Sequence, residues 1–236
     1  MIHTVDLKEI QHFSKDSAQW WDENGPFKPL HRLNPVRIGY IKAQILKHFA
    51  TLEGLKILDV GCGGGLVCEP LTRLGAHITG IDADPVAIET AQSHAAESGL
   101  SIPYIHGAVE DLTETYDIVL ALEIVEHVAD IRTFVQAIAN RLNPNGLAIF
   151  STLNRTPKSF ALGIVAAEYI LRWVPRRTHS WKKFITPAEL SRMCRTSALS
   201  PIDITGLMFN PCTGDFTLSK RDIAVNYFLS AKNQRA

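Results

Sequence analysis

The sequence predicts an α/β fold in which helices cover both faces of a mostly parallel sheet that ends in an antiparallel hairpin. From Lys56 onward, short apolar segments alternate with helical stretches, which is the order typical of a parallel sheet. Segments such as residues 116–122 are almost continuously apolar, so we expect these strands to be buried on both sides. Near the C-terminus, two strand-like pieces flank the turn-rich sequence NPCTGD, which favours a hairpin.

The expected elements can be placed along the chain from turn and capping signals. Pro35 suits the first turn of a helix, and Asp84 followed by Pro85 is a typical helix start. The pair Thr186 and Glu189 forms a capping box. We expect helices at 7–21, 34–50, 85–98 and 131–142 and from 186 onward, and strands at 56–60, 77–81, 103–107, 116–122, 146–152, 202–209 and 215–229.

Charge and cysteine content exclude several classes of protein. The 236-residue chain has 24 basic and 24 acidic side chains, so we expect no nucleic-acid partner attracted by bulk charge. Its four cysteines contain no CxxC pair, which gives no support to a zinc or thioredoxin-like site. The N-terminus does not have the pattern of a secretory signal, and no stretch reaches the roughly 20 apolar residues of a membrane span. These features predict a cytoplasmic protein.

The sequence ILDVGCGGG joins a strand, a tight turn and a helix, and its glycines allow a ligand to approach the backbone closely. The pattern DxGxGxG is formed by Asp59, Gly61, Gly63 and Gly65. Asp82 ends the next strand, where its carboxylate would meet ribose hydroxyls. The dinucleotide fingerprint does not fit, because Leu66 or Cys68 would take its last position. The acidic Asp59 favours a cationic ligand, and S-adenosylmethionine carries an ammonium and a sulfonium.

These motifs resemble those of class I S-adenosylmethionine-dependent methyltransferases, as do YDIV and LNPNGLAIFST further along the chain. A narrower resemblance runs over nearly the whole sequence: WWD, FKPLHRLNPVRIGYI, LEIVEHV, STLNRTPKS, AEYILRWVP and KKFITPAEL are similar to segments of bacterial ubiquinone-biosynthesis O-methyltransferases. The resemblance implies a Rossmann-like fold with seven strands, in a single domain of residues 1–236. Its expected parts are a helical cap (1–50), a cofactor-binding core (54–152), an inserted lid and membrane-contact segment (153–185), and a closing helix and strands (186–236).

This resemblance implies O-methylation of polyprenylated catechol and demethylubiquinol intermediates, with S-adenosylmethionine as the methyl donor. Two alternatives stay open, a methyltransferase for another phenol or for carbon and a catalytically silent carrier of prenyl lipids. The intact glycine loop with Asp82 speaks against the carrier, and Leu66 speaks against a nicotinamide-dependent reductase. By resemblance, the cofactor contacts include Arg37, Gly61, Asp82 and Leu122. Ala108 stands where many relatives have an acid, so Val109 and Glu110 are the expected contacts of the adenine.

The triplet Glu123, Glu126 and His127 follows the fourth expected strand, at the edge where ligands bind in such sheets. Two carboxylates and an imidazole can hold a divalent cation, and the triplet looks like the magnesium site of eukaryotic relatives. Alternatively, His127 is the general base and Glu126 orients it. A third interpretation is an acidic helix start that only the helix dipole favours. His179 is a second candidate base.

Residues 157–175 are mostly apolar, and basic residues surround them. The flanking residues are Arg155, Lys158, Arg176, Arg177, Lys182 and Lys183. An apolar helix with basic flanks can lie in a membrane interface and attract anionic lipids, as an enzyme for a polyprenylated substrate requires. We therefore expect residues 157–183 to form a lid that also contacts the inner membrane peripherally, and a lid alone, packed on the sheet, is the alternative. A ubiquinone-biosynthesis complex is a further candidate partner.

Overall fold

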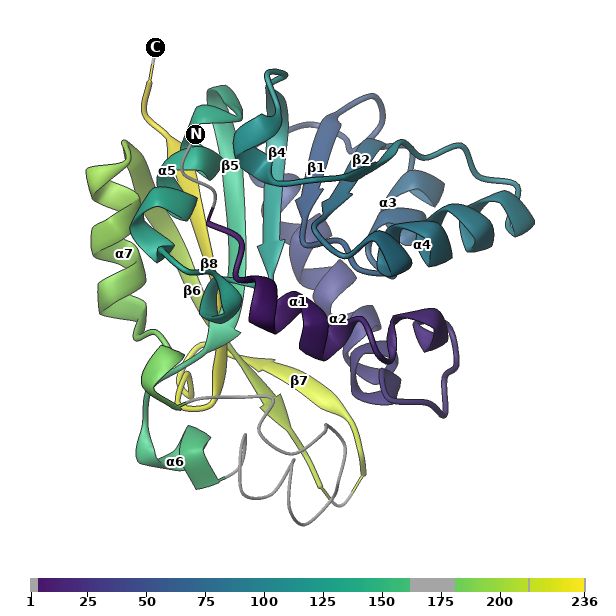
Figure 1. Ribbon diagram of the computed structural model, residues 1–236. Coiled ribbons are helices and arrows are strands. Elements are labelled where there is room, and N and C mark those ends of the chain that lie inside the picture. The colour runs from purple at the N-terminus through teal and green to yellow at the C-terminus, as the bar shows by residue number, and fades with distance from the viewer. Residues whose placement is uncertain (1–3, 162–180, 212, 236) are drawn as a thin grey trace.

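A computed structural model describes residues 4–161, 181–211 and 213–235 of the chain (Figure 1). The strands are β1 (Lys56–Val60), β2 (His77–Asp82), β3 (Tyr104–His106), β4 (Tyr116–Leu122), β5 (Leu142–Leu153), β6 (Leu199–Phe209), β7 (Phe216–Ser219) and β8 (Asn226–Asn233). The helices are α1 (Leu7–Phe13), α2 (Lys28–Ile45), α3 (Cys68–Arg73), α4 (Pro85–Glu97), α5 (Ile131–Asn140), α6 (Pro157–Ser159) and α7 (Pro187–Thr196). Short 3₁₀ turns are η1 (Ser17–Gln19), η2 (Val109–Asp111), η3 (Val125–His127) and η5 (Trp181–Lys183).

All of the strands belong to one sheet with the order β3-β2-β1-β4-β5-β8-β6-β7. The strands β1 to β5 are all parallel to one another. In contrast, β8 is antiparallel to both β5 and β6, and β6 and β7 form an antiparallel hairpin. The mostly parallel α/β class with an antiparallel end is therefore confirmed. The sheet has eight strands rather than the expected seven, because residues 220–225 turn the chain and separate β7 from β8.

The sheet separates two apolar cores, and successive residues of a strand alternate between them. Ile118 and Leu120 face the core formed with α2, α3 and α4, whereas Val119 and Ala121 face the core formed with α5 and α7. Each of these four side chains is fully buried. Burial on both faces explains the continuous apolar pattern of the central strands.

The N-terminal region differs most from the expected elements. The first helix stops at Phe13 instead of continuing to residue 21, since the chain then turns so that Trp20 rests on the glycine loop. The second helix begins at Lys28, because Pro29 rather than Pro35 occupies its first turn. Residues 4–27, which we call the N-terminal strap, run across the face seen in Figure 1 in front of the sheet.

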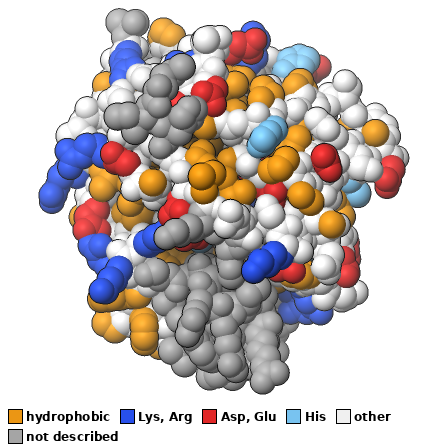
Figure 2. Space-filling model, viewed as in Figure 1, with side chains coloured by type: hydrophobic (Ala, Val, Ile, Leu, Met, Phe, Trp, Pro, Cys, Tyr) orange, Lys and Arg blue, Asp and Glu red, His pale blue; other side chains and the backbone are white. Residues whose placement is uncertain are grey.

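The surface around the strap is mixed in character. Figure 2 shows apolar side chains gathered in the middle of this face, with acidic and basic side chains scattered around them. No helix within the described ranges is long and apolar enough to cross a membrane. Residues 162–180, which include His179 and most of the expected membrane-contact segment, lie outside the described residues.

Candidate active site

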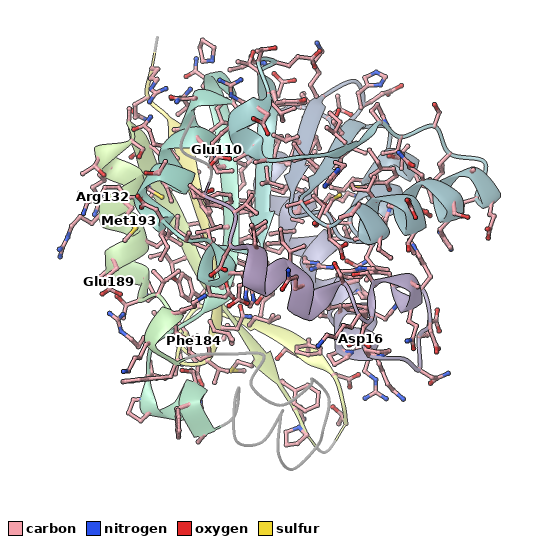
Figure 3. The ribbon with its side chains drawn as sticks, in the orientation of Figure 1. Asp16, Glu110, Arg132, Phe184, Glu189 and Met193 are labelled. Carbon is pink, nitrogen blue, oxygen red and sulfur yellow. The ribbon has the colours of Figure 1, made fainter. Side chains whose placement is uncertain are left out.

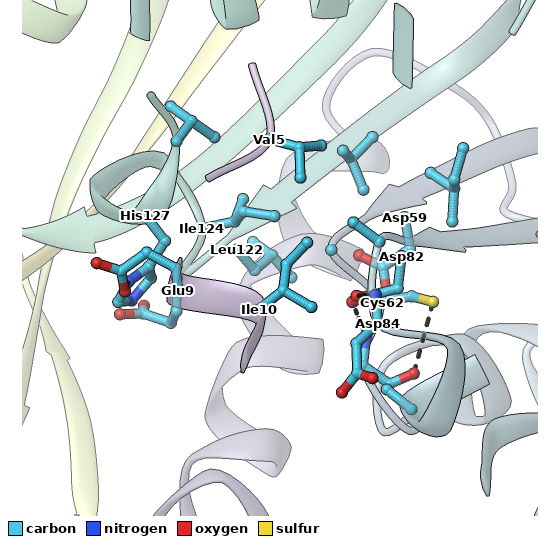
Figure 4. A pocket seen from close by; sticks show the side chains of 18 of the residues that line it. Val5, Glu9, Ile10, Asp59, Cys62, Asp82, Asp84, Leu122, Ile124 and His127 are labelled. Carbon is cyan, nitrogen blue, oxygen red and sulfur yellow. Dashed lines mark hydrogen bonds and ion pairs between the residues drawn. The ribbon is translucent and has the colours of Figure 1, made fainter. Parts of the chain in front are cut away.

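The strand order places the site. The chain moves outward from β1 through β2 to β3, then returns to β4 on the other side of β1 and continues to β5. Ligands of open α/β sheets bind at such a reversal, beyond the carboxyl ends of the strands. A cavity of about 410 Å³ lies there, and the strap forms part of its wall. Figure 4 shows the cavity between acidic residues at the carboxyl ends of β1 and β2 (Asp59, Asp82 and Asp84) and the pair Glu9 and His127.

The glycine loop after β1 is shaped by close contacts with side chains. Gly61 and Gly63 have φ angles of 73° and 52°, which favour glycine. A Cβ atom would lie 2.2 Å from the Ile124 side chain at Gly61, and 2.4 Å from the Trp20 ring at Gly63. Both glycines border the cavity. Gly65 does not border it, and its φ of 86° places it against the Tyr104 hydroxyl instead.

Asp82 binds the glycine loop as well as bordering the cavity. Its Oδ2 accepts a hydrogen bond from the Gly63 N–H (2.8 Å), and its Oδ1 accepts one from the Asp84 N–H (2.8 Å). Desolvation raises the pKa of Asp82, although these backbone bonds oppose the shift. The carboxylate is thus held at the end of β2, and its remaining lone pairs can accept bonds from the two hydroxyls of a ribose.

A buried pair of opposite charges lies beneath the loop. Asp59 is 2% exposed and Arg37 is 5% exposed, and both border the cavity. Burial raises the pKa of Asp59 to about 6, and the charge of Arg37 opposes this rise. The Nε and Nη2 atoms of Arg37 donate to Asn34 Oδ1, which orients the guanidinium (3.2 and 2.9 Å). One anion and one cation at this end suit the ammonium and carboxylate of an amino-acid group.

Glu110 also borders the cavity and lies close to Thr4, at the start of the strap (Figure 3). Its Oε1 accepts hydrogen bonds from the backbone N–H (3.2 Å) and hydroxyl (2.6 Å) of Thr4. Its Oε2 is buried and has no hydrogen-bond partner among the residues that the structure describes. Val109 and Leu122 also border the cavity here. An apolar slot with one unpartnered carboxylate oxygen fits an adenine and its exocyclic amine. The residues present therefore fit S-adenosylmethionine.

The strap is fastened along its length to the loops of the carboxyl edge. The Ser17 hydroxyl donates to Asp84, and the Trp21 Nε1–H donates to the Gly64 carbonyl (2.8 Å). Between them, Trp20 borders the cavity and packs against the glycine loop. The strap therefore covers the site and limits the access of water to it.

The acidic corner after β4 is tightly bonded. Glu123 has a φ of 55°, unusual for a residue other than glycine, and such strain is typical of functional sites. Its carboxylate accepts bonds from the Ser151 hydroxyl (2.6 Å) and the Asn226 amide (2.9 Å). Desolvation and the charge of Glu126 raise the pKa of Glu123. Glu126 is buried and accepts a bond from the Thr152 hydroxyl (2.6 Å).

His127 is paired with a residue from the strap. Its Nδ1 lies 2.9 Å from Glu9 Oε2, and Glu9 Oε1 lies 2.8 Å from Lys183 Nζ. The hydrogen bond with His127 lowers the pKa of Glu9 to about 2, with Lys183 adding to the effect. Desolvation opposes the protonation of His127, but Glu9 and Glu126 together raise its pKa.

The three predicted metal ligands border the cavity, but their side chains do not converge. Each is bonded to a different partner, and in the described part of the chain no group of three His, Cys, Asp or Glu side chains is arranged to hold a metal. As arranged, the triplet does not fit magnesium. The metal site therefore stays a prediction, and none of the chemistry below is derived from it.

Comparisons with known proteins agree with this site. A family model described as a methyltransferase domain matches residues 35–201. The structure of magnesium protoporphyrin IX methyltransferase from Synechocystis PCC 6803 with bound S-adenosylmethionine superposes with a TM-score of 0.66, at 16% identity over 97% of this chain and 98% of that one. A possible histamine N-methyltransferase from Thermotoga maritima has a TM-score of 0.65, at 14% identity over 97% of this chain and all of its own. The fold and the glycine loop thus define a class I methyltransferase that uses S-adenosylmethionine.

Relatives of higher identity define the family more narrowly. The ubiquinone biosynthesis O-methyltransferase of Bartonella bacilliformis is 50% identical over 97% of this chain and 96% of its own length. That of Azorhizobium caulinodans is 48% identical over 97% of this chain and 94% of its own. The chain belongs to the ubiquinone biosynthesis O-methyltransferase family.

Several residues of the site could not be found from the sequence. Thr4, Glu9, Ile10 and Ser17 border the cavity from the strap, and no local pattern distinguishes them from ordinary residues of an N-terminal helix. The side chains of Thr4, Glu9 and Ser17 form hydrogen bonds with segments more than 60 residues away in the chain. Only the folded arrangement reveals them.

Proposed function

We propose that this enzyme methylates a hydroxyl on an aromatic ring that carries a neighbouring hydroxyl and a polyprenyl tail, as in the catechol and demethylubiquinol precursors of ubiquinone. The observation that carries the proposal is the continuity of the cavity. The cofactor residues and the acidic corner with His127 border the same space, and apolar side chains such as Ile10, Phe134 and Leu153 line it. A ring hydroxyl held in the acidic corner would lie near the cofactor end of this space.

The chemistry asked of the protein is modest. When bound, S-adenosylmethionine supplies a methyl group that its sulfonium already activates. The protein must align an oxygen with that methyl group, keep water out and accept the hydroxyl proton. In this proposal the strap keeps water out, and His127 takes the proton as general base. The carboxylates of Glu9 and Glu126 favour a cationic imidazolium beside them after proton transfer.

The activity test is methyl transfer from labelled S-adenosylmethionine to a catechol with a short prenyl tail. We expect methylated product, and a higher KM for the same catechol without a tail. Adding magnesium or EDTA distinguishes the two candidate roles of Glu123, Glu126 and His127, which are metal binding and general-base catalysis. Transfer lost in EDTA and restored by magnesium would assign them to a metal, whereas transfer unaffected by EDTA would leave His127 as the base. No transfer despite measured cofactor binding would refute the acceptor class and leave the methyltransferase class intact.

We also propose that residues 157–183 bring the enzyme to an anionic membrane surface on the cytoplasmic side, where a polyprenyl tail resides. Support comes from the two described ends of the segment. Phe160 and Trp181 are 47% and 38% exposed and pack edge to face with ring centroids 6.4 Å apart. Exposed aromatic rings suit the interface of a bilayer. Among the basic flanks, Lys158 and Lys183 pair with acidic residues, so their charge is partly neutralised.

The membrane test uses the exposed Lys182, because reversing Lys183 would also break the contact with Glu9. We expect the double variant Phe160→Ala and Lys182→Glu to sediment less with vesicles containing phosphatidylglycerol. Binding to neutral vesicles is the control for charge. Unchanged sedimentation would count against this face as the membrane contact.

A further inference from the structure

We propose that Glu9 is a positioning residue that holds His127 in the tautomer protonated at Nδ1, so that the lone pair of the neutral ring lies on Nε2. The inference rests on the role of His127 in the proposed function. It concerns a residue of the N-terminal strap, outside the cofactor motifs and the acidic corner.

The contact geometry supports a specific pairing rather than a surface ion pair. Glu9 and His127 are 23% and 15% exposed, and they lie next to each other on the side of the cavity away from Asp59 and Asp82 (Figure 4). The Nδ1–Oε2 distance of 2.9 Å is that of a charge-assisted hydrogen bond. The second carboxylate oxygen binds Lys183, so both oxygens of Glu9 are fixed by segments far away in the chain.

The chemistry of a carboxylate determines which nitrogen holds the proton. An ionised carboxylate can only accept hydrogen bonds, so the imidazole nitrogen that faces it must donate. Lys183 on the other oxygen favours the ionised form of Glu9. His127 therefore donates from Nδ1, and a neutral ring then carries its lone pair on Nε2. Similar carboxylate–histidine pairs fix the ring orientation in metal sites and in catalytic triads.

Glu9 and His127 belong to different parts of the chain. Glu9 lies in α1, within the strap that covers the cavity, whereas His127 lies in η3, which follows β4. His127 is therefore held in its working orientation only when the strap is closed. Closure would exclude water and complete the proton acceptor in the same movement.

The decisive experiment measures the tautomer directly in the full-length protein. Long-range ¹H–¹⁵N spectra of histidine-labelled protein distinguish the two tautomers at a pH where the His127 ring is neutral, and the His127→Gln variant identifies its signals. We expect the Nδ1–H form in the wild type. In Glu9→Gln we expect a shift toward the Nε2–H form, because an amide can also donate to Nδ1. An Nε2–H ring in the wild type, or the same tautomer in both proteins, would overturn the proposal.

Kinetics provide the second readout. We expect kcat of Glu9→Gln to fall by about 10- to 100-fold, as is usual for loss of an orienting partner, with the affinity for S-adenosylmethionine unchanged. Glu53→Gln, the same change at an exposed position before β1, is the matched control and should retain full activity. A kcat unchanged in Glu9→Gln would also contradict the proposal. Because the spectra need no acceptor, a wrong acceptor class would abolish the kinetic readout but leave the tautomer shift.

Discussion

Replacing Gly64 by alanine would put a methyl group where the strap rests on the glycine loop. The new Cβ would lie 2.3 Å from Trp20 Cβ and 2.5 Å from Trp20 Cγ. Carbon atoms in contact are normally about 3.5–4.0 Å apart, so Trp20 must retreat by more than about 1 Å. The clash involves the Cβ of Trp20, which no rotamer change can move. The backbone of the strap must therefore shift.

The size of the effect follows from the cost of overpacking. Inserting a methyl group into a well-packed contact typically costs about 1–3 kcal/mol. If the strap stays closed, this cost appears as a lower free energy of unfolding. If the strap opens instead, the cost appears as weaker binding of S-adenosylmethionine, by about tenfold for each 1.4 kcal/mol.

Urea unfolding and titration calorimetry with S-adenosylmethionine together measure both outcomes. The chain provides a matched control in Gly39, an interior position of α2 where a Cβ would meet no atom within 4 Å. Gly39→Ala should stabilise the protein by about 0.5–1 kcal/mol, because alanine is the better helix former. A Gly64→Ala variant that is as stable as the wild type and binds the cofactor as tightly would refute the proposed contact between strap and loop.

Three further predictions concern the buried charges and the start of α7. Because the pKa of Asp59 is raised to about 6 in the folded state, the wild type should lose stability relative to Asp59→Asn as the pH rises from about 4 to about 6. The change should be on the order of 3 kcal/mol, and a pH-independent difference in unfolding free energy would contradict it. Arg37→Met should weaken binding of S-adenosylmethionine at least about tenfold in calorimetry, since a hydrogen bond to a charged group contributes about 1.5–3 kcal/mol. Thr186→Ala removes the hydroxyl that caps the Glu189 N–H and should lower the unfolding free energy by about 1 kcal/mol in urea titrations.

The fold was largely predictable because its signals are local. Burial of β1, β2, β4 and β5 on both faces favours apolar segments, and the turns between strands require glycine or a capping residue such as Asp84. The eighth strand was missed for a reason that is not local. Residues 215–229 look like one strand, but β7 pairs only with β6, while β8 must pass between β5 and β6. No pattern within the segment specifies that the chain turns there.

That the residues predicted to bind the cofactor meet at one cavity was predictable for a similar reason, whereas the contacts of the triplet after β4 were not. Asp59, Gly61 and Asp82 lie at strand ends, where topology alone brings them together. The structure gives a second reason for Gly61 and Gly63, since a Cβ there would collide with Ile124 and Trp20. The triplet after β4 was located correctly at the cavity, but the sequence could not show that each side chain already has its own partner.

The N-terminal strap and the region that follows β5 both lie outside the alternating core, and Lys183 joins them by pairing with Asp6 and Glu9. The carboxyl edge of a parallel sheet is formed by short loops, which can shape the floor of a site but cannot cover it. The cover comes from an additional segment, the N-terminal strap, which borders the cavity. Glu9 of the strap bonds to Lys183 of the region after β5, and the same Glu9 is bonded to His127. A change at Lys183 can therefore reach His127 through the carboxylate of Glu9, although Lys183 itself does not border the cavity.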